Sequence, residues 1–478
     1  MTTPEDRTAG EAATGAWNYG SATDVGEVSL DARGGLFSGG AWVEAASGRY
    51  APVMDPATGK TICELAEAGV EDVKDAVSAA KEAQRQWTRL KPVMRMRTLL
   101  SIAGALESQG EDLAATAAID EGTPIRLARE EVSLAGRIWR YYAGWCDKLS
   151  AAAPWREAEP IGICGHVIGP RKALIGASLE LAPALAAGNT CVLKPHPAAS
   201  LAVLRLGKML EEAELPAGVV NLVTGGEETT EAIARHRLVR QVTLDVSDGF
   251  PEEVAAACVA SGTRVRARRR GVVPHLIFDD ASIDQAIEGV VAAALMGEGE
   301  PRPAGAAVFV QEPVLEEVTA KLKERLGTVR VGDPRDVNTD VGPINGEDRL
   351  AAVRAFLDQA RENGAQVFEA AGTDEPETGW WQRPCLVTRP HPAQRSAVEA
   401  MDGPVVTVVS FRTPGEALAT VGAMAARDAA AVWTDKGSKM FEIVRQLNAQ
   451  TVWCNTGGRF DPAAPPAGIA ALRNSLDS

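Results

Sequence analysis

The stretch LAPALAAGNTCVLKP, residues 181–195, decides the fold class because it leads from an apolar helical run directly into a strand. Gly188 follows the apolar run, and glycine often ends a helix because it adopts the left-handed conformation without steric cost. Asn189 then makes the turn into the strand TCVL. The stretch therefore predicts a helix, a tight turn and a strand, in that order.

Strands and helices alternate on both sides of this stretch. The expected strands are PIGICGHVI at 160–168, GVVNLVTG at 218–225 and QVTLDV at 241–246, and a helix is expected over 200–213. Strands separated by helices of this length need crossover connections. The pattern therefore predicts a mostly parallel sheet that is covered on both faces.

A second set of alternating elements runs from PHLIFDD at 274–280 to AAVWT at 430–434, and it predicts a second α/β domain. Within this set, the run VRV at 329–331 is expected to form a strand. Upstream of the first set, helices are expected over about 70–87, 94–106 and 127–149. Residues 1–33 are rich in small and polar side chains and predict an N-terminal extension without a fold of its own.

The composition limits what the protein can do. A chain of 478 residues is too long for one core and predicts two or three domains. The net charge of −15 opposes binding to nucleic acid and to anionic membranes. The first residues lack the pattern of a signal peptide, and no apolar run is long enough for a membrane span. Because the seven cysteines are scattered and predict no zinc site or disulfide framework, we expect a soluble, cytoplasmic protein whose partners are small molecules or proteins.

Six stretches of the sequence resemble the aldehyde dehydrogenase superfamily, in the family's order and spacing. They are LFSGGAWVEAASGRYAPVMDPATG, LAPALAAGNTCVLKP, ELPAGVVNLVTG, VGDPRDVNTDVGPI, DGPV and QTVWCNTGGRFDPAAP. The resemblance extends from about residue 35 to about residue 466. It implies an α/β fold with a Rossmann-like cofactor domain at 34–140 and 159–273, a catalytic α/β domain at 274–455 and a short tail at 456–478.

The resemblance also implies a bridging element, in which a hairpin and a C-terminal strand join subunits. Here only SAAAPWREAE, residues 150–159, separates Leu149 from the strand that starts at Pro160. Residues 141–158 are therefore expected to be a shortened remnant of the hairpin. We expect that the usual contact between identical subunits cannot form in full.

The family's chemistry uses a cysteine nucleophile, a glutamate that activates water and an asparagine that holds the oxyanion. Aligning the family's motifs places Arg302 of GEPRPAG at the cysteine position, Arg268 of RRRGVVP at the glutamate position and Arg171 of PRKAL at the asparagine position. A guanidinium stays protonated and cannot act as a nucleophile. No cysteine lies within thirty residues of Arg302, so no shift of the alignment restores the thiol. The cysteines are expected to be small buried residues, except that Cys454 lies on the strand that runs beside the family's active site.

The positions that hold NAD or NADP in the family are also changed. Lys194 keeps the lysine that contacts the adenosine ribose in the family. Asp245 would direct a carboxylate toward the pyrophosphate, and Val246 replaces a glycine that allows the backbone to approach the ligand. Ala400 and Asp402 occupy positions where the family has Glu and Phe. We therefore expect weak dinucleotide binding or none.

These replacements predict a family member that has lost catalysis and that acts as a partner or regulatory subunit of an active paralogue. Self-association through a non-standard contact is an alternative mode of assembly. Two other functions stay open: an NAD(P)-dependent aldehyde oxidoreductase with an unrecognised site, and an anion or metabolite sensor.

The sensor hypothesis depends on Arg171, Arg268 and Arg302. The family's geometry would bring them around one funnel, where a bound anion would compensate their charges. The opposite interpretation is that the arginine run at 264–270 lies on a solvated loop.

Overall fold

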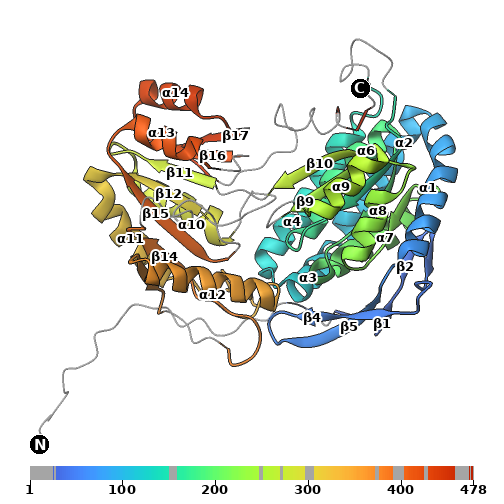
Figure 1. Cartoon of the computed structure of the whole chain (residues 1–478), viewed down its shortest axis with the longest axis horizontal. Coiled ribbons are helices and arrows are strands. Elements are labelled where there is room, and N and C mark those ends of the chain that lie inside the picture. Colours follow the sequence, from blue (N-terminus) through green and yellow to red (C-terminus); the bar gives the residue numbers. More distant parts are fainter. Residues whose placement is uncertain are drawn as a thin grey trace, which may run out of the picture.

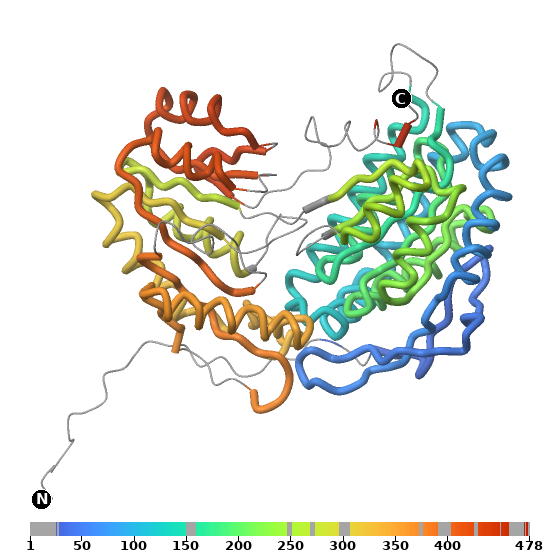
Figure 2. The backbone as a smooth tube through the Cα atoms, in the orientation of Figure 1, coloured from blue at the N-terminus to red at the C-terminus, as the bar shows by residue number. Residues whose placement is uncertain are grey.

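The computed structural model describes residues 25, 28–149, 159–246, 251–269, 273–296, 306–371, 376–390, 403–424, 429–449, 451–457, 473, 475 and 476. They form two α/β domains, which lie on opposite sides of the molecule in Figure 1. Figure 2 shows that the first domain takes the blue to green part of the chain and the second the yellow to red part. Within the described ranges, no helix is both long and apolar enough to cross a membrane.

The first domain, called here the cofactor-type domain, is built on a seven-stranded sheet with the order β10-β9-β6-β7-β8-β2-β3. Its strands are β2 (Leu36–Ser38), β3 (Ala41–Val43), β6 (Ile163–Val167), β7 (Thr190–Lys194), β8 (Val220–Leu222), β9 (Val239–Val246) and β10 (Arg264–Arg269). Strands β6 to β10 are parallel, whereas β2 and β3 are antiparallel additions at one edge. A smaller sheet has the order β1-β5-β4 and contains β1 (Arg33–Gly34), β4 (Tyr50–Asp55) and β5 (Lys60–Ala66).

Helices cover both faces of the large sheet. They are α1 (Val70–Arg89), α2 (Pro92–Ser108), α3 (Gly110–Glu121), α4 (Ile125–Ala143), α6 (Ala173–Ala187), the short η1 (Pro197–Ala199), α7 (Leu201–Glu212), α8 (Glu227–Arg235) and α9 (Glu252–Ser261). Successive residues of β7 alternate between two core clusters, since Cys191 and Leu193 join one and Val192 joins the other. The parallel sheet is therefore buried on both faces, as the sequence predicted.

Helix α6 is the central element of the predicted helix-turn-strand stretch, and each of its residues is buried. Gly188 ends it in the left-handed conformation with φ of 93°, and its backbone N–H donates to the carbonyl oxygens of Ala184 and Leu185. The next residues enter β7, so the predicted turn is confirmed. Because α6 begins at Ala173, its first turn lies next to Arg171 and positions that residue at the end of the sheet.

The second domain, called here the catalytic-type domain, has a seven-stranded sheet with the order β13-β14-β15-β12-β11-β16-β17. Its strands are β11 (Val273–Ile277), β12 (Ala306–Gln311), β13 (Gln366–Glu369), β14 (Cys385–Thr388), β15 (Val405–Phe411), β16 (Ala429–Trp433) and β17 (Thr451–Cys454). Only β13 pairs in the antiparallel direction among these described strands. The helices are α10 (Ile283–Val291), the π-turn η2 (Ala292–Met296), η3 (Glu312–Val314), α11 (Leu315–Gly327), α12 (Glu347–Glu362), α13 (Pro414–Gly422) and α14 (Gly437–Gln446).

Several sequence predictions differ from the structure. Helix α3 was not predicted, because its alanine-rich sequence GEDLAATAAIDE has little contrast between apolar and polar faces. The run VRV forms no strand but only an isolated bridge between Val331 and Val341. Helix α4 ends at Ala143 rather than near residue 149. The arginine run forms the edge strand β10 up to Arg269 rather than a loop, because its backbone pairs with β9.

Both ends of the described chain pack on the cofactor-type domain. Val25 and Leu30, from the predicted extension at 1–33, pack against its main core cluster. Near the other end, Leu476 is 3% exposed and forms an isolated antiparallel bridge with Pro160. The side-chain amide of Asn189 donates to the carbonyl oxygen of Ser475 at 2.6 Å. The described C-terminal residues therefore pack on the cofactor-type domain of the same chain. Residues 150–158 of the predicted hairpin remnant lie outside the described ranges.

Candidate functional site

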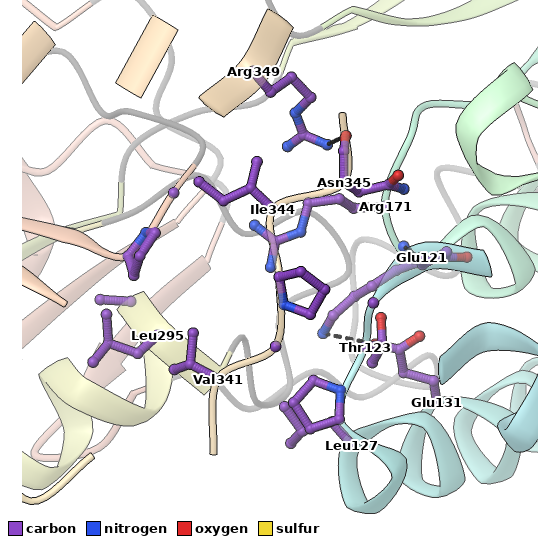
Figure 3. A pocket seen from close by; sticks show the side chains of 18 residues that line it. Glu121, Thr123, Leu127, Glu131, Arg171, Leu295, Val341, Ile344, Asn345 and Arg349 are labelled. Carbon is purple, nitrogen blue, oxygen red and sulfur yellow. Dashed lines mark hydrogen bonds and ion pairs between the residues drawn. The ribbon is translucent and has the colours of Figure 1, made fainter. Parts of the chain in front are cut away.

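A small pocket lies between the two domains, and Arg171 lines it. One wall comes from residues 121–124 and α4, and the other comes from residues 341–345, the start of α12 and residues 403–404. The cavity volume is about 60 Å³. Figure 3 shows the Arg171 side chain reaching into the pocket next to Ile344. Arg171 therefore belongs to a site that both domains build.

Glu121 fixes the segment that carries Arg171. Its carboxylate oxygens accept from the backbone N–H groups of Lys172, at 2.6 Å, and Ala173, at 3.1 Å. Lys172 has φ of 52°, and this left-handed conformation lies directly before α6. Burial, followed by the charges of Glu131 and Asp120, raises the pKa of Glu121 to about 8. Burial therefore favours the neutral form of Glu121, and its hydrogen bonds hold the start of α6 in place.

Carboxyl and ammonium groups lie close to Arg171. Glu131 is 6% exposed, and its Oε1 lies 3.8 Å from the Lys172 Nζ, an ion pair drawn as a dashed line in Figure 3. Burial raises the pKa of Glu131, whereas the positive charges of Lys172 and Arg171 act to lower it. Where the resemblance implies a neutral amide that donates to an oxyanion, this chain has a permanent cation beside a buried carboxyl group.

Asn345 connects the catalytic-type domain to the cofactor-type domain at the pocket. Its side-chain amide nitrogen donates to the carbonyl oxygens of Pro170 at 2.8 Å and Ala198 at 2.6 Å. Arg349, in the first turn of α12, donates to the Asn345 carbonyl oxygen at 3.4 Å and also lines the pocket. Sequence reasoning missed both residues, because the groups that Asn345 contacts are far away in the sequence.

The structure describes only the backbone of one of the other two predicted arginines. Arg302 lies outside the described residues. The backbone of Arg268 is placed on β10, in register with Asp245 on β9, while its side chain lies outside the description. The predicted convergence of three arginines therefore stays a prediction.

One arginine of the same run points toward a buried carboxylate. The Arg266 guanidinium lies 3.9 Å from the Glu180 Oε2. That oxygen also lies 3.6 Å from the His166 Nδ1, and Glu180 is only 3% exposed. The interpretation of the whole run as a solvated face is therefore wrong for Arg266.

All seven cysteines of the chain have free thiols. Cys63, Cys146, Cys164, Cys191, Cys258 and Cys385 are buried, and Cys454 on β17 is exposed. Burial is the first cause that raises each thiol's pKa, to about 11 for Cys63 and Cys146 and to about 12 for Cys164 and Cys385. The pKa values of Cys191, Cys258 and Cys454 are also raised. No thiol therefore has the lowered pKa that activates a nucleophilic cysteine.

The described residues at the implied dinucleotide positions fit that ligand poorly. Lys194 ends β7, and it is 4% exposed. Burial lowers its pKa to about 8, against the opposing charge of Glu227. Glu227 and Glu228 occupy the first turn of α8, and Asp245, which the resemblance places toward the pyrophosphate, lies near the end of β9. A carboxylate at that position opposes a phosphate group. Ala400 and Asp402 and the side chain of Val246 lie outside the description.

The part of the chain that is described contains no cluster of His, Cys, Asp and Glu suited to a metal ion.

The fold and the aligned positions define the class of protein. The sequence model of the aldehyde dehydrogenase family matches residues 42–471, and the chain belongs to this family. DhaS of Bacillus subtilis (strain 168), whose name assigns it to the aldehyde dehydrogenases, is 29% identical over 454 residues, and the match covers 92% of each protein. The NAD⁺ complex of an aldehyde dehydrogenase from Bacillus cereus is 28% identical with a TM-score of 0.88, over 93% of this chain and 95% of that one. PnpE from Pseudomonas sp. WBC-3, solved with nicotinamide adenine dinucleotide, is 28% identical with a TM-score of 0.88, over 93% of this chain and 96% of that one.

Proposed function

We propose that this protein is a catalytically silent member of the aldehyde dehydrogenase family that acts as a partner or regulatory subunit of an active member. The observation that carries the proposal is the state of the thiols, since burial raises the pKa of all seven. A thiolate is the form that attacks a carbonyl carbon. Six of the seven thiols are also buried, so only Cys454 could present a thiolate to a carbonyl carbon.

Arg171 supports the same proposal, because it bears on how the transition state would be stabilised. The family's oxyanion position needs a donor that is pre-organised toward the substrate oxygen. Here Arg171 occupies that position, and Glu131 responds to its charge. Removing a single oxyanion donor typically costs about 10²–10³ in kcat, and the loss of several catalytic groups leaves little rate to measure.

The residues at the implied NAD-binding positions also support the loss of catalysis. The relatives from Bacillus cereus and Pseudomonas sp. WBC-3 are solved with NAD, whereas this chain has Asp245 at the position that the resemblance places toward the pyrophosphate. Repulsion between carboxylates and a pyrophosphate weakens binding. We therefore expect this chain to bind NAD more weakly than those relatives.

Two surfaces of the catalytic-type domain support association with another chain. Strand β17 is the last strand of its sheet within the described residues, and such an edge can accept a further strand. Helix α14, which packs on β16, exposes 75% of Phe441. An exposed aromatic side chain favours burial against a partner. In our proposal that partner is an active paralogue in the cytoplasm.

The test is reconstitution with an active aldehyde dehydrogenase from the same cell. That enzyme is co-expressed with the full chain, and the complex is analysed by size-exclusion chromatography with light scattering. We expect co-elution and a changed turnover of the active enzyme, both of which Phe441→Ser weakens. Separate elution together with unchanged turnover would refute the partner role. A matched control is Val259→Ser, which changes a side chain that is 81% exposed on the other domain.

Cys454 favours one rival function, because it is exposed on the strand that the resemblance places beside the active site. In that case the protein is an NAD(P)-dependent aldehyde oxidoreductase with a relocated thiol. The rival predicts turnover that Cys454→Ala abolishes. Our proposal predicts no turnover with either thiol or alanine at this position.

A further inference from the structure

A long loop of the catalytic-type domain packs on the cofactor-type domain. Helix α11 ends at Gly327 and α12 begins at Glu347, so the 19 residues 328–346 connect them. A loop longer than about 12–15 residues without regular structure is uncommon in a compact domain, and an ordered loop of that length usually has a function. Residues 330–345 of this loop are called here the interdomain strap.

Hydrogen bonds within the strap close it into a loop. The backbone N–H groups of Asp340 and Val341 donate to the carbonyl oxygen of Arg330 at 2.9 and 3.0 Å. The Arg330 guanidinium also pairs with the Asp340 carboxylate at 3.1 Å. The Thr339 hydroxyl group donates to the carbonyl oxygen of Asp333 at 2.7 Å. Because the strap is bonded to itself, it is pre-organised and can hold other segments without a large loss of chain entropy.

The strap is hydrogen-bonded to three separate segments of the cofactor-type domain. The carbonyl oxygen of Pro334 accepts from the backbone N–H of Ile125, the first residue of α4, at 2.7 Å. At the other end of the strap, the Asn345 Nδ2 donates to the carbonyl oxygens of Pro170 at 2.8 Å and Ala198 at 2.6 Å. These partners lie far apart in the sequence, so the strap connects segments that would otherwise move separately.

The strap also approaches the turn after α3 more closely than two side chains would permit. Gly122 has φ of 71°, and a Cβ atom there would lie 2.7 Å from the ring of Pro343. A Cβ atom on Gly342 would clash with the carbonyl oxygen of Gly122. This backbone contact between the domains therefore needs glycine at both positions.

The segment that carries Arg171 is attached to both domains. Asn345 of the strap binds the carbonyl group of Pro170, directly before Arg171. Glu121 of the cofactor-type domain binds the backbone N–H of Lys172, directly after it. Figure 3 shows the Arg171 side chain beside the strap. A movement of the strap would therefore also move Arg171.

From these contacts we propose that the interdomain strap is a conformational lock, in which Asn345 is the latch. While the two hydrogen bonds of Asn345 are formed, the domains and the Arg171 segment keep one arrangement. When these bonds break, the strap, the start of α4 and the Arg171 segment are released together, and each domain stays folded. The lock goes beyond the proposed partner role and does not depend on it.

The experiment is hydrogen–deuterium exchange of the full chain, resolved to single residues by mass spectrometry. Asn345→Asp keeps the size of the side chain and removes the N–H donor. We expect the amides of Ile125 and Lys172 to exchange about tenfold faster or more in this variant, because two hydrogen bonds of the lock are lost. The amide of Val192, in the middle of β7, should exchange as in the wild type, which shows that the sheet stays folded.

The amide of Ile125 distinguishes a lock from a local contact. Its acceptor is Pro334, so neither partner of this hydrogen bond is changed by the substitution at position 345. Exchange at Ile125 therefore rises only where the strap moves as a unit. Faster exchange confined to the neighbours of residues 170, 198 and 345 would overturn the proposal.

Further variants provide an independent test and two matched controls. Gly342→Ala pushes the strap away from the turn after α3, so it should give the same exchange pattern as Asn345→Asp. Asn338→Asp changes a strap residue for which the structure describes no side-chain hydrogen bond, and it should exchange like the wild type. Gly327→Ala should also do so, because a Cβ atom there would meet none of the described atoms within 4 Å. An equal response from Asn338→Asp and Asn345→Asp would contradict the role of the latch.

The wild type gives a test even where a variant fails to fold. The amides of Ile125 and Lys172 should show the same protection from exchange, within about twofold after correction for their intrinsic rates, since one opening exposes both. Protection that differs by tenfold or more would show that the two segments open separately, and the lock would then be wrong.

Discussion

Replacing Glu121 by glutamine should reduce the dependence of stability on pH. Burial, Glu131 and Asp120 raise the pKa of Glu121 to about 8 in the folded protein from an ordinary value of 4.5. The unfolded chain therefore loses this proton near pH 4.5, whereas the folded protein keeps it until about pH 8. The contribution of Glu121 to stability is fully present below pH 4.5 and is lost as the pH rises to about 8.

The size of the effect follows from the two pKa values. At about 1.36 kcal/mol for each pKa unit, the change from 4.5 to about 8 sets an upper bound of roughly 5 kcal/mol on the loss. Glutamine cannot ionise, so Glu121→Gln lacks this loss. Its amide nitrogen cannot accept from the backbone of Lys172 or Ala173, which adds a cost of about 1 kcal/mol at every pH.

The assay is equilibrium urea unfolding of the wild type and Glu121→Gln at pH 5 and pH 8.5. We expect the variant to be less stable than the wild type at pH 5 and to gain on it by several kcal/mol at pH 8.5. Glu111→Gln, which changes an exposed carboxylate on the same helix α3, should show a much smaller difference between the two pH values. A stability difference for Glu121→Gln that is the same at both pH values would refute the assignment of a buried, protonated Glu121.

Three further predictions concern stability and thiol chemistry. Leu476→Ala should lower the free energy of unfolding by about 2–5 kcal/mol, because it leaves a cavity at a site that is 3% exposed. Leu100→Ala, at a 43% exposed site, should lower it much less. Urea unfolding measures both variants, and equal losses would contradict the packing of the C-terminal residues on the cofactor-type domain. Gly188→Ala should cost about 1–2 kcal/mol, because φ of 93° is strained for any residue with a Cβ atom, and an unchanged thermal midpoint would contradict the left-handed end of α6. In the native protein a thiol reagent should modify Cys454 first and the six buried thiols only after unfolding, and rapid modification of two or more thiols would contradict the burial described here.

The local elements of the fold could be predicted from the sequence. The turn from α6 to β7 depends on Gly188 and the residues beside it, so a short stretch contains the necessary information. The alternation of strands and helices likewise predicted two parallel-rich sheets. Helix α3 could not be recognised from apolar periodicity, and β10 was missed because arginine runs are usually solvated, whereas its backbone gains pairing with β9.

The pocket could be predicted only in part. Alignment with the family identified Arg171, because the motif before α6 is local. Glu121 and Asn345 were missed because their partners lie 51 and 175 residues away, and only the folded chain brings them together. Their roles depend on burial and on backbone hydrogen bonds that no sequence pattern specifies.

The most direct test of the central claim is aldehyde-dependent formation of NADH or NADPH by the purified chain, measured over short aliphatic and aromatic aldehydes. A closely matched active aldehyde dehydrogenase serves as the positive control. Because burial raises the pKa of every thiol and Arg171 stands where the resemblance implies the oxyanion donor, we predict no turnover above background. Saturable turnover by the wild type that Cys454→Ala abolishes would contradict the claim and establish the protein as an active oxidoreductase.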